Sequence, residues 1–281
     1  MNDLTKKTNE DIVTYSNFDR KRKKKSAVRA VSIIAVALVL VAVISFIIVK
    51  KYFVVKSVIV NGSETYSSAE IKASCGISEG DVIFFVRAAD VRKRLAPSYP
   101  FIRTVEIEKE YPSGVNVIIT EEEPVYCFEY DGEFFVMSRE MKLLEKSTEK
   151  ERITGKFKNV KPVTVPPVYK AVLSDRLLFV SEKDTRHVGE VLYELYGWSG
   201  YDKISEIDIS NRFDIRIVYD GRITVRFGSK SGFLSKLKFA EGIIMAYSGS
   251  SYGEIIIDST KEAVARITDP EADQSKDSPE G

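Results

Sequence analysis

The chain has little of the chemistry from which enzyme active sites and metal sites are built. Its 281 residues include two cysteines and a single histidine. The spacing of Cys75 and Cys127 fits no metal or redox motif, and His187 has no cysteine or paired carboxylate at ligand spacing. A disulfide between the two cysteines is possible outside the cytoplasm, but we favour two unpaired, half-buried thiols and a surface histidine.

Common motifs of nucleotide binding and hydrolysis are also missing. The sequence contains no G-x-S-x-G, no P-loop and no H-E-x-x-H, and its glycines are dispersed in turns. The formal charge of +1 says little about nucleic acid. We therefore expect no catalytic, cofactor or metal site and no nucleic-acid partner. The composition, 44% hydrophobic and 30% charged, does allow a substantial core, and the length favours two modest domains.

One long uncharged run is present near the amino terminus. Residues 30–49, AVSIIAVALVLVAVISFIIV, would span roughly 30 Å as a helix, which matches the hydrocarbon thickness of a bilayer. A cleaved signal peptide is the competing interpretation, but its apolar region is usually shorter and ends in small residues. This run ends in FIIV followed by Lys50 and Lys51, so we predict a transmembrane helix.

The basic residues beside this run predict its orientation. RKRKKK at residues 20–25 and Arg29 precede the run, whereas Lys50, Lys51 and Lys56 follow it. The excess of positive charge before the helix places the amino terminus in the cytoplasm. RKRKKK could instead bind nucleic acid or anionic lipid, but beside a membrane helix a topology anchor is its ordinary role.

The two ends of the chain are polar. Residues 1–29 lack apolar periodicity and are interpreted as a basic cytoplasmic tail. Residues 261–281, which include DPEADQSKDSPEG, are predicted to form a largely disordered carboxy-terminal tail. The folded part should therefore lie between the membrane helix and residue 260.

Residues 53–123 predict a small β-α-α-β-β module. The first strand, VVKSVIV, is followed by a turn at Asn61-Gly62 and by a helix whose Ser67 and Glu70 have capping-box spacing. A second helix covers about 88–95, and two strands alternate on either side of Pro-Ser-Gly.

Residues 124–260 predict a mixed or antiparallel β domain with helices at about 185–196 and 232–247. An Asp-Gly turn in YCFEYDGEFFVM should be a two-residue turn, because a longer loop would oppose two glutamates. In FDIRIVYDGRITVRF we expect a three-residue loop, Tyr219 to Gly221, which pairs Ile217 with Ile223, Ile215 with Val225 and Phe213 with Phe227. The fold class is therefore α+β, with a single-pass membrane helix followed by two domains.

The strand GEIIID is a better candidate for function than any titratable group. It is the last strand expected, and a last strand often forms a sheet edge whose free N–H and C=O groups can pair with a strand from another chain. A strand packed only on its own sheet is the alternative, and composition alone slightly favours it.

VNVIITEEEPV, residues 115–125, ends in three carboxylates. In a strand Glu121 and Glu123 would lie on one side roughly 6.6 Å apart, which overlaps the spacing of inverting glycosidases. A general acid also needs a desolvating pocket, and carboxylates at a strand end before a proline are usually solvated. We favour a solvated joint between domains. A membrane-anchored cell-wall hydrolase that uses Glu121 and Glu123 is the alternative function.

These elements together resemble the FtsQ/DivIB family of bacterial division proteins, in which a membrane helix precedes a POTRA module and a β domain. The resemblance rests on the order of VKSVIVNGSETYSSAEIKASCGISEGDVIFF, the P-F-I and Y-P segments, and EEEPV at the junction. DGEFFVMSREMKLLE and DGRITVRFGSKSGFLSKLKFAEGII extend it into the β domain. Two positions depart from the family pattern: VPPVYK lacks a terminal glycine, and Ile256-Ile257 stand where Asp-Leu is expected.

The resemblance implies a non-enzymatic divisome scaffold at the division septum, with its carboxy-terminal domains outside the cytoplasm. Its implied partners are the bitopic coiled-coil proteins of the FtsL and DivIC/FtsB types, which regulate the machinery of septal peptidoglycan synthesis. It also implies that a partner strand pairs with the last strand. The expected partner-binding residues are Glu254, Ile255, Ile256, Ile257 and Asp258, with Lys236 nearby.

Overall fold

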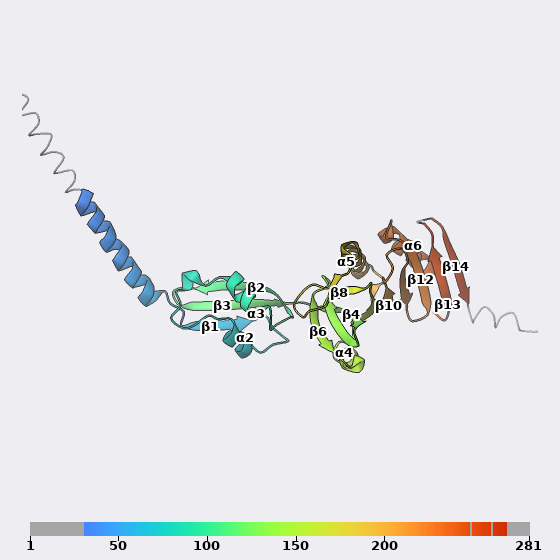
Figure 1. The fold of residues 1–281 in the computed structure, drawn as a ribbon, viewed down its shortest axis with the longest axis horizontal. Helices are drawn as coiled ribbons and strands as arrows, with labels where there is room; N and C mark the ends of the chain where they lie inside the picture. Colours follow the sequence, from blue (N-terminus) through green and yellow to red (C-terminus); the bar gives the residue numbers. More distant parts are fainter. Residues whose placement is uncertain (1–30, 248, 260, 269–281) are drawn as a thin grey trace, which may run out of the picture. The chain divides into compact units, whose positions relative to one another are not determined.

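The computed structural model describes residues 31–247, 249–259 and 261–268. The predicted cytoplasmic tail, residues 1–29, and the chain beyond residue 268 lie outside the described residues. The first described element is a helix, Val31–Tyr52, which is long and apolar enough to cross a membrane (Figure 1). Its apolar side chains are exposed, as a membrane-spanning helix requires.

The β-α-α-β-β module is present in the predicted order. Its strands form one three-stranded sheet in the order β1-β3-β2. The capping box forms as predicted, since Ser67 Oγ accepts from the Glu70 amide and the Glu70 carboxylate accepts from the Ser67 amide. The elements are β1 (Ser57–Asn61), α2 (Ser68–Ser74), η1 (Ile83–Phe85), α3 (Ala88–Leu95), β2 (Ile102–Glu110) and β3 (Gly114–Glu121).

The β domain is built on a nine-stranded mixed sheet in the order β14-β13-β12-β11-β10-β7-β4-β5-β6. The elements in the first part of the domain are β4 (Pro124–Tyr130), β5 (Glu133–Ser138), β6 (Leu143–Ser147), α4 (Lys150–Lys156), β7 (Lys161–Thr164), β8 (Val168–Lys170) and β9 (Leu178–Phe179). Those in the second part are α5 (Glu182–Tyr196), η2 (Tyr201–Lys203), β10 (Ile204–Asp208), β11 (Ile215–Tyr219), β12 (Ile223–Gly228), α6 (Phe233–Met245), β13 (Tyr252–Ile257) and β14 (Ala263–Thr268).

Apolar side chains on the two faces of this sheet decide where the helices pack. Val191 on α5 and Leu237 on α6 belong to the large buried cluster that includes Phe128 of β4 and Val225 of β12. The other face carries a small cluster in which Ile153 of α4 packs against Cys127 and its neighbours. The two longer helices therefore cover one face, and α4 lies on the opposite one (Figure 1).

One predicted hairpin is confirmed and the other has a different register. β4 and β5 are joined by a two-residue turn, because Tyr130 pairs with Glu133. Between β11 and β12, Tyr219 pairs with Ile223, so the predicted Ile217–Ile223 pairing and its loop are wrong. Asp220 and Gly221 both have positive φ, 56° and 68°, so the chain reverses after Tyr219. The inward face is still apolar, but Phe213 is 67% exposed and does not belong to it.

The largest difference from the sequence prediction is β14. Residues 261–281 were expected to be a tail, yet Ala263–Thr268 form a strand that pairs antiparallel with β13. The reversal is stabilised near Ser259, whose hydroxyl oxygen accepts from the amides of Lys261 and Glu262. The polar sequence that follows masked a short strand with three β-favouring side chains, Val264, Ile267 and Thr268.

The described chain packs as two compact units. The first contains residues 31–59, 77–87 and 107–117. The second contains residues 60–76 and 88–106 and the described chain from residue 118 onward. Each unit is treated by itself below.

Candidate functional site

The predicted partner-binding segment lies on β13 or directly after it. β13 pairs in parallel with β12 and antiparallel with β14. The expectation that Glu254–Asp258 form the edge of the sheet is therefore wrong, because β14 occupies the position that a partner strand was expected to take.

The side chains of β13 divide between the two faces of the sheet. Ile255 and Ile257 are buried in the core, whereas Ile256 lies on the opposite face and is half-buried. Glu254 lies 3.7 Å from the Arg226 guanidinium, and both side chains remain about one-third exposed. Such a partly exposed pair contributes little to stability, so the strand is held mainly by its two isoleucines and its ladders.

Lys236 has a structural role that its sequence context does not reveal. It is only 6% exposed, and its Nζ donates to the carbonyl oxygens of Phe227 at 2.7 Å and Ser229 at 3.3 Å. Burial lowers the pKa of Lys236, and the nearby Asp258 carboxylate opposes that effect. The ammonium therefore satisfies carbonyl groups at the end of β12.

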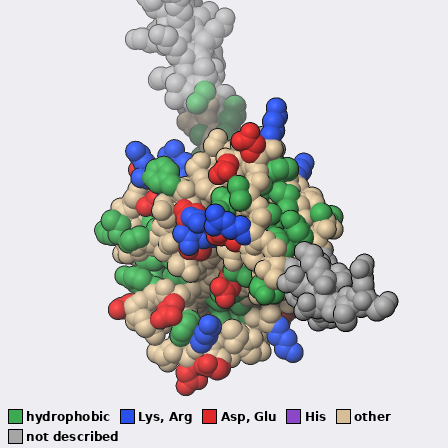
Figure 2. Space-filling model, turned by 90° about the vertical axis from the view of Figure 1, so that its right-hand side faces the viewer, with side chains coloured by type: hydrophobic (Ala, Val, Ile, Leu, Met, Phe, Trp, Pro, Cys, Tyr) green, Lys and Arg blue, Asp and Glu red, His purple; other side chains and the backbone are tan. Residues whose placement is uncertain are grey.

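Four of the six predicted residues line one hollow at this end of the sheet. Its volume is about 410 Å³, and its floor includes the ends of β12 and β13. Glu254 and Ile255 do not line it. Figure 2 faces the right-hand side of Figure 1, where β13 and β14 lie, and shows hydrophobic, basic and acidic side chains interspersed. The predicted residues lining the hollow are Lys236, Ile256, Ile257 and Asp258.

The outer side of β14 is the feature here most suited to binding another chain. β14 is the terminal strand of the sheet, and no strand in the described part of the chain pairs with its outer side. Its sequence, AVARIT, contains one charge and no proline, and its Val264 side chain is 47% exposed. An edge with these properties can accept a further strand.

Glu121 is held by the loop that follows β1. Its carboxylate accepts from Ser63 Oγ at 2.6 Å and from Thr65 Oγ1 at 2.8 Å, and the Thr65 amide lies 3.2 Å away. The carboxylate therefore positions the segment before α2, within the second compact unit.

Glu122 and Glu123 are bound to different partners. Glu122 lies 4.0 Å from the Lys142 ammonium, and its side chain is 9% exposed. Burial lowers the pKa of Lys142, while Glu122 raises it. Glu123 accepts from the Tyr196 hydroxyl at 2.9 Å. The expectation of three solvated carboxylates is wrong for Glu122, and the engagement of Glu121 and Glu123 with separate partners does not favour a paired acid and base.

The histidine and the cysteines are buried. His187 is 9% exposed, so the expectation of a surface histidine is wrong, and its Nε2 has no hydrogen-bond partner. Burial lowers the pKa of His187. Cys75 and Cys127 are free thiols, as favoured from the sequence, but both are buried, so the expectation that they are half-buried is wrong. Burial raises the pKa of Cys127. In the described residues no group of three or more His, Cys, Asp or Glu side chains could hold a metal ion.

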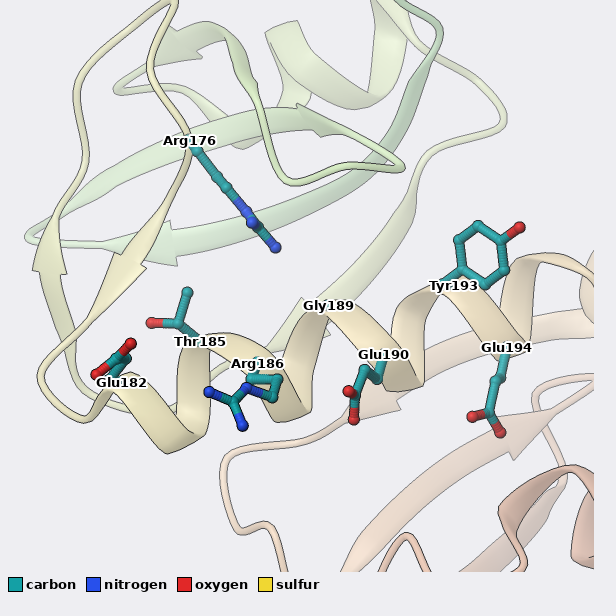
Figure 3. A pocket seen from close by; sticks show the side chains of 8 residues that line it. All are labelled: Arg176, Glu182, Thr185, Arg186, Gly189, Glu190, Tyr193 and Glu194. Atoms are coloured by element: carbon teal, nitrogen blue, oxygen red, sulfur yellow. The ribbon is translucent and has the colours of Figure 1, made fainter.

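A second hollow, of about 480 Å³, runs along α5 (Figure 3). Arg176 extends toward the helix near Gly189, where a Cβ atom would meet the guanidinium at 3.0 Å. The remaining lining residues mix acidic and basic side chains and include no cysteine or histidine. Charges of both signs in an open hollow suit surface contacts better than covalent chemistry.

The described elements define a class of protein: a POTRA module follows an apolar helix suited to anchor it in a membrane, and a β domain follows the module. Residues 53–122 match the family model of the FtsQ-type POTRA domain. Two relatives named "Cell division protein DivIB", both from Clostridium botulinum, are 22% and 23% identical over 236 residues. The aligned part covers 83% of this chain and 88% of each relative.

The chain belongs to the FtsQ/DivIB family, and this homology makes it a cell division protein. The helix before the POTRA domain is consistent with a membrane anchor.

Proposed function

We propose that the protein is a bitopic scaffold of the division machinery at the septum. Its amino terminus lies in the cytoplasm, and its POTRA and β domains lie outside. There it links bitopic coiled-coil proteins of the FtsL and DivIC/FtsB types and helps to control septal peptidoglycan synthesis. Support for a role in division comes from the DivIB relatives, and support for the orientation comes from the basic residues that precede the helix.

The observation that carries the scaffold proposal is the outer side of β14, with which no described strand pairs. Strand addition obtains affinity from main-chain hydrogen bonds and specificity from the side chains that alternate beside them. The hollow beside Lys236 and Asp258 provides neighbouring side chains of both charge signs for a partner that crosses this end of the sheet. We infer that the partner strand pairs with the outer side of β14. The predicted residues of β13 and α6 then lie on the inner side of β14.

Proline substitutions along β14 test this assignment. In an antiparallel strand the N–H groups of successive residues point to opposite sides, so only one of Val264→Pro and Ala265→Pro removes an outward donor. We expect the proline variant that lacks the outward N–H group to stay folded in its β domain and no longer to co-purify with the coiled-coil partners. Ala265→Ser is the matched control and should bind like the wild type.

Removal of residues 261–281 distinguishes β14 from β13 as the acceptor. If β14 is the acceptor, the membrane-anchored protein without residues 261–281 should no longer co-purify with the coiled-coil partners. Unchanged or stronger co-purification would contradict the assignment, because a partner could then pair directly with β13.

A further inference from the structure

An exposed group of aromatic side chains lies directly after the membrane helix. The membrane-proximal aromatic cluster consists of Tyr52, Phe53, Phe84, Phe85 and Tyr111. Four of these five side chains are exposed: Tyr52 by 55%, Phe84 by 45%, Phe85 by 73% and Tyr111 by 57%. Exposed apolar side chains that gather in this way mark surfaces that bind a protein or a membrane.

Three segments of the chain contribute to the membrane-proximal aromatic cluster. The ring centroids of Phe53 and Phe84 are 5.3 Å apart, and those of Phe84 and Tyr111 are 5.6 Å apart. Phe53 and Tyr111 meet edge-on at 6.4 Å. These separations are typical of packed aromatic pairs, so the rings of Phe53, Phe84 and Tyr111 form one surface, and Tyr52 and Phe85 are their neighbours in the sequence. Phe85, next in sequence to Phe84, is the most exposed member.

Backbone hydrogen bonds tie these segments to the first residues after the helix. The Phe53 amide donates to Val49 O at 2.9 Å and so continues the last helical turn. The Phe53 carbonyl accepts from the Ile83 amide at 3.0 Å. The Lys56 amide donates to Ser113 O at 2.9 Å, which holds the turn that contains Tyr111.

Chain length keeps the cluster near the bilayer, because an extended chain advances at most about 3.5 Å per residue. The hydrogen bonds begin at the residue that follows Tyr52. All five aromatic residues and the helix belong to the same compact unit. The rings are therefore held close to the end of the membrane helix.

The chemistry of the surroundings fits the interface between lipid and water. Tyrosine is enriched at the level of the lipid headgroups, and phenylalanine is typical of the inserted face of interfacial segments. Basic side chains there extend toward phosphate. Lys50 and Lys51 follow the apolar run, and the Lys109 Nζ donates to the carbonyl oxygen of Phe84 at 3.1 Å. Because the helix tethers the cluster to the membrane, its effective concentration at the lipid surface is high.

We propose that the membrane-proximal aromatic cluster inserts into the headgroup region of the leaflet from which the helix emerges. The inserted rings form a second attachment to the bilayer and restrict the tilt of the first compact unit. This attachment requires no partner protein and is independent of the binding edge proposed on β14.

Tryptophan reporters in the full chain test the insertion. Phe85→Trp and Tyr111→Trp place reporters on two segments of the cluster, and Phe213→Trp is the control, because Phe213 is 67% exposed and lies in the second unit. Each protein is reconstituted at low protein-to-lipid ratio into vesicles of phosphatidylcholine with bromine on the upper part of the acyl chains. The native Trp198 is common to all samples, so the wild-type emission is subtracted.

We expect the emission added by Phe85→Trp and Tyr111→Trp to lie at shorter wavelength than that of Phe213→Trp. The brominated lipid should quench most of it and leave the control nearly unchanged. Emission from both cluster reporters that is quenched no more than the Phe213→Trp control would overturn the proposal. The cluster would then face water or another protein.

Discussion

Lys236 lies on the buried side of α6, where its ammonium is hydrogen-bonded to two carbonyl groups of the β12 end. Glu121 holds the segment before α2 in a similar manner, with a carboxylate instead of an ammonium. Both residues drew attention from the sequence as candidates for function. Their hydrogen bonds show that each has a structural role in the domain that contains it.

Lys236→Met is expected to destabilise the β domain. The substitution keeps the apolar stem but leaves carbonyl oxygens of Phe227 and Ser229 without their donor, which costs about 1–3 kcal/mol. Urea unfolding of the detergent-solubilised chain measures the loss. Lys238→Met, on the exposed side of the same helix, should change stability by less than about 0.5 kcal/mol. Equal stability of the two variants would contradict the structural role of Lys236.

His187 gives the protein a predictable response to mild acid. Burial lowers its pKa in the folded state, with a smaller effect in the same direction from Lys230. The unfolded chain therefore binds a proton first, as the pH falls through about 6.5, and the free energy of unfolding decreases. We expect the midpoint temperature of thermal unfolding to decrease as the pH is lowered from 7.5 to 5.5.

His187→Gln should flatten this pH dependence, because His187 is the only histidine in the chain. The measurement is the thermal midpoint of both proteins at a series of pH values. A wild-type midpoint that rises on acidification would contradict the assignment of this pH dependence to His187. An equal pH dependence of the midpoint in His187→Gln would also contradict it.

At the scale of elements, the pairing of β13 with β14 depends on Gly253. Its φ is +146°, and an added Cβ would fall inside the contact distance of the Arg266 carbonyl oxygen. Gly253→Ala should therefore detach β14 and speed hydrogen exchange of the amides in residues 263–268. Gly242→Ala is the control, since a Cβ there meets nothing within 4 Å and alanine favours a helix. Equal exchange in both variants would contradict a β14 held through this contact.

Local signals in the sequence predicted most helices and strands, but not the register of one hairpin or the strand at the edge of the sheet. The Ser67–Glu70 capping box and the Asp131-Gly132 turn have short-range causes, so they could be recognised directly. The register after Tyr219 depends on the backbone angles of Asp220 and Gly221, which apolar alternation does not encode. β14 was missed because its strand pattern is short and is followed directly by polar sequence.

The same limits apply to the candidate site. The structure places Ile256, Ile257 and Asp258 around one hollow with Lys236, and their part in binding a partner stays a prediction. The position of β13 inside the sheet could not be inferred, because that depends on whether a later strand returns to pair with it. The burial of His187 likewise depends on tertiary packing around the start of α5. The polar sequence of that helical turn does not indicate it.

At the scale of the whole molecule, the proposed attachment to the membrane and the proposed recognition of a partner fall in different compact units. The apolar helix and the proposed aromatic attachment belong to the first compact unit, and the open edge of β14 belongs to the second. Each unit therefore carries one of the two proposed binding surfaces. This arrangement, together with the homology to division proteins, suits a scaffold whose partners act at the membrane.

The most direct test of the scaffold account is the location of the full chain in dividing cells. A fluorescent protein fused to the amino terminus, which the proposed orientation places in the cytoplasm, leaves the proposed binding edge unmodified. The account predicts a band of fluorescence at midcell that forms before constriction and persists while the septum closes. A uniform distribution around the cell membrane throughout division would contradict it.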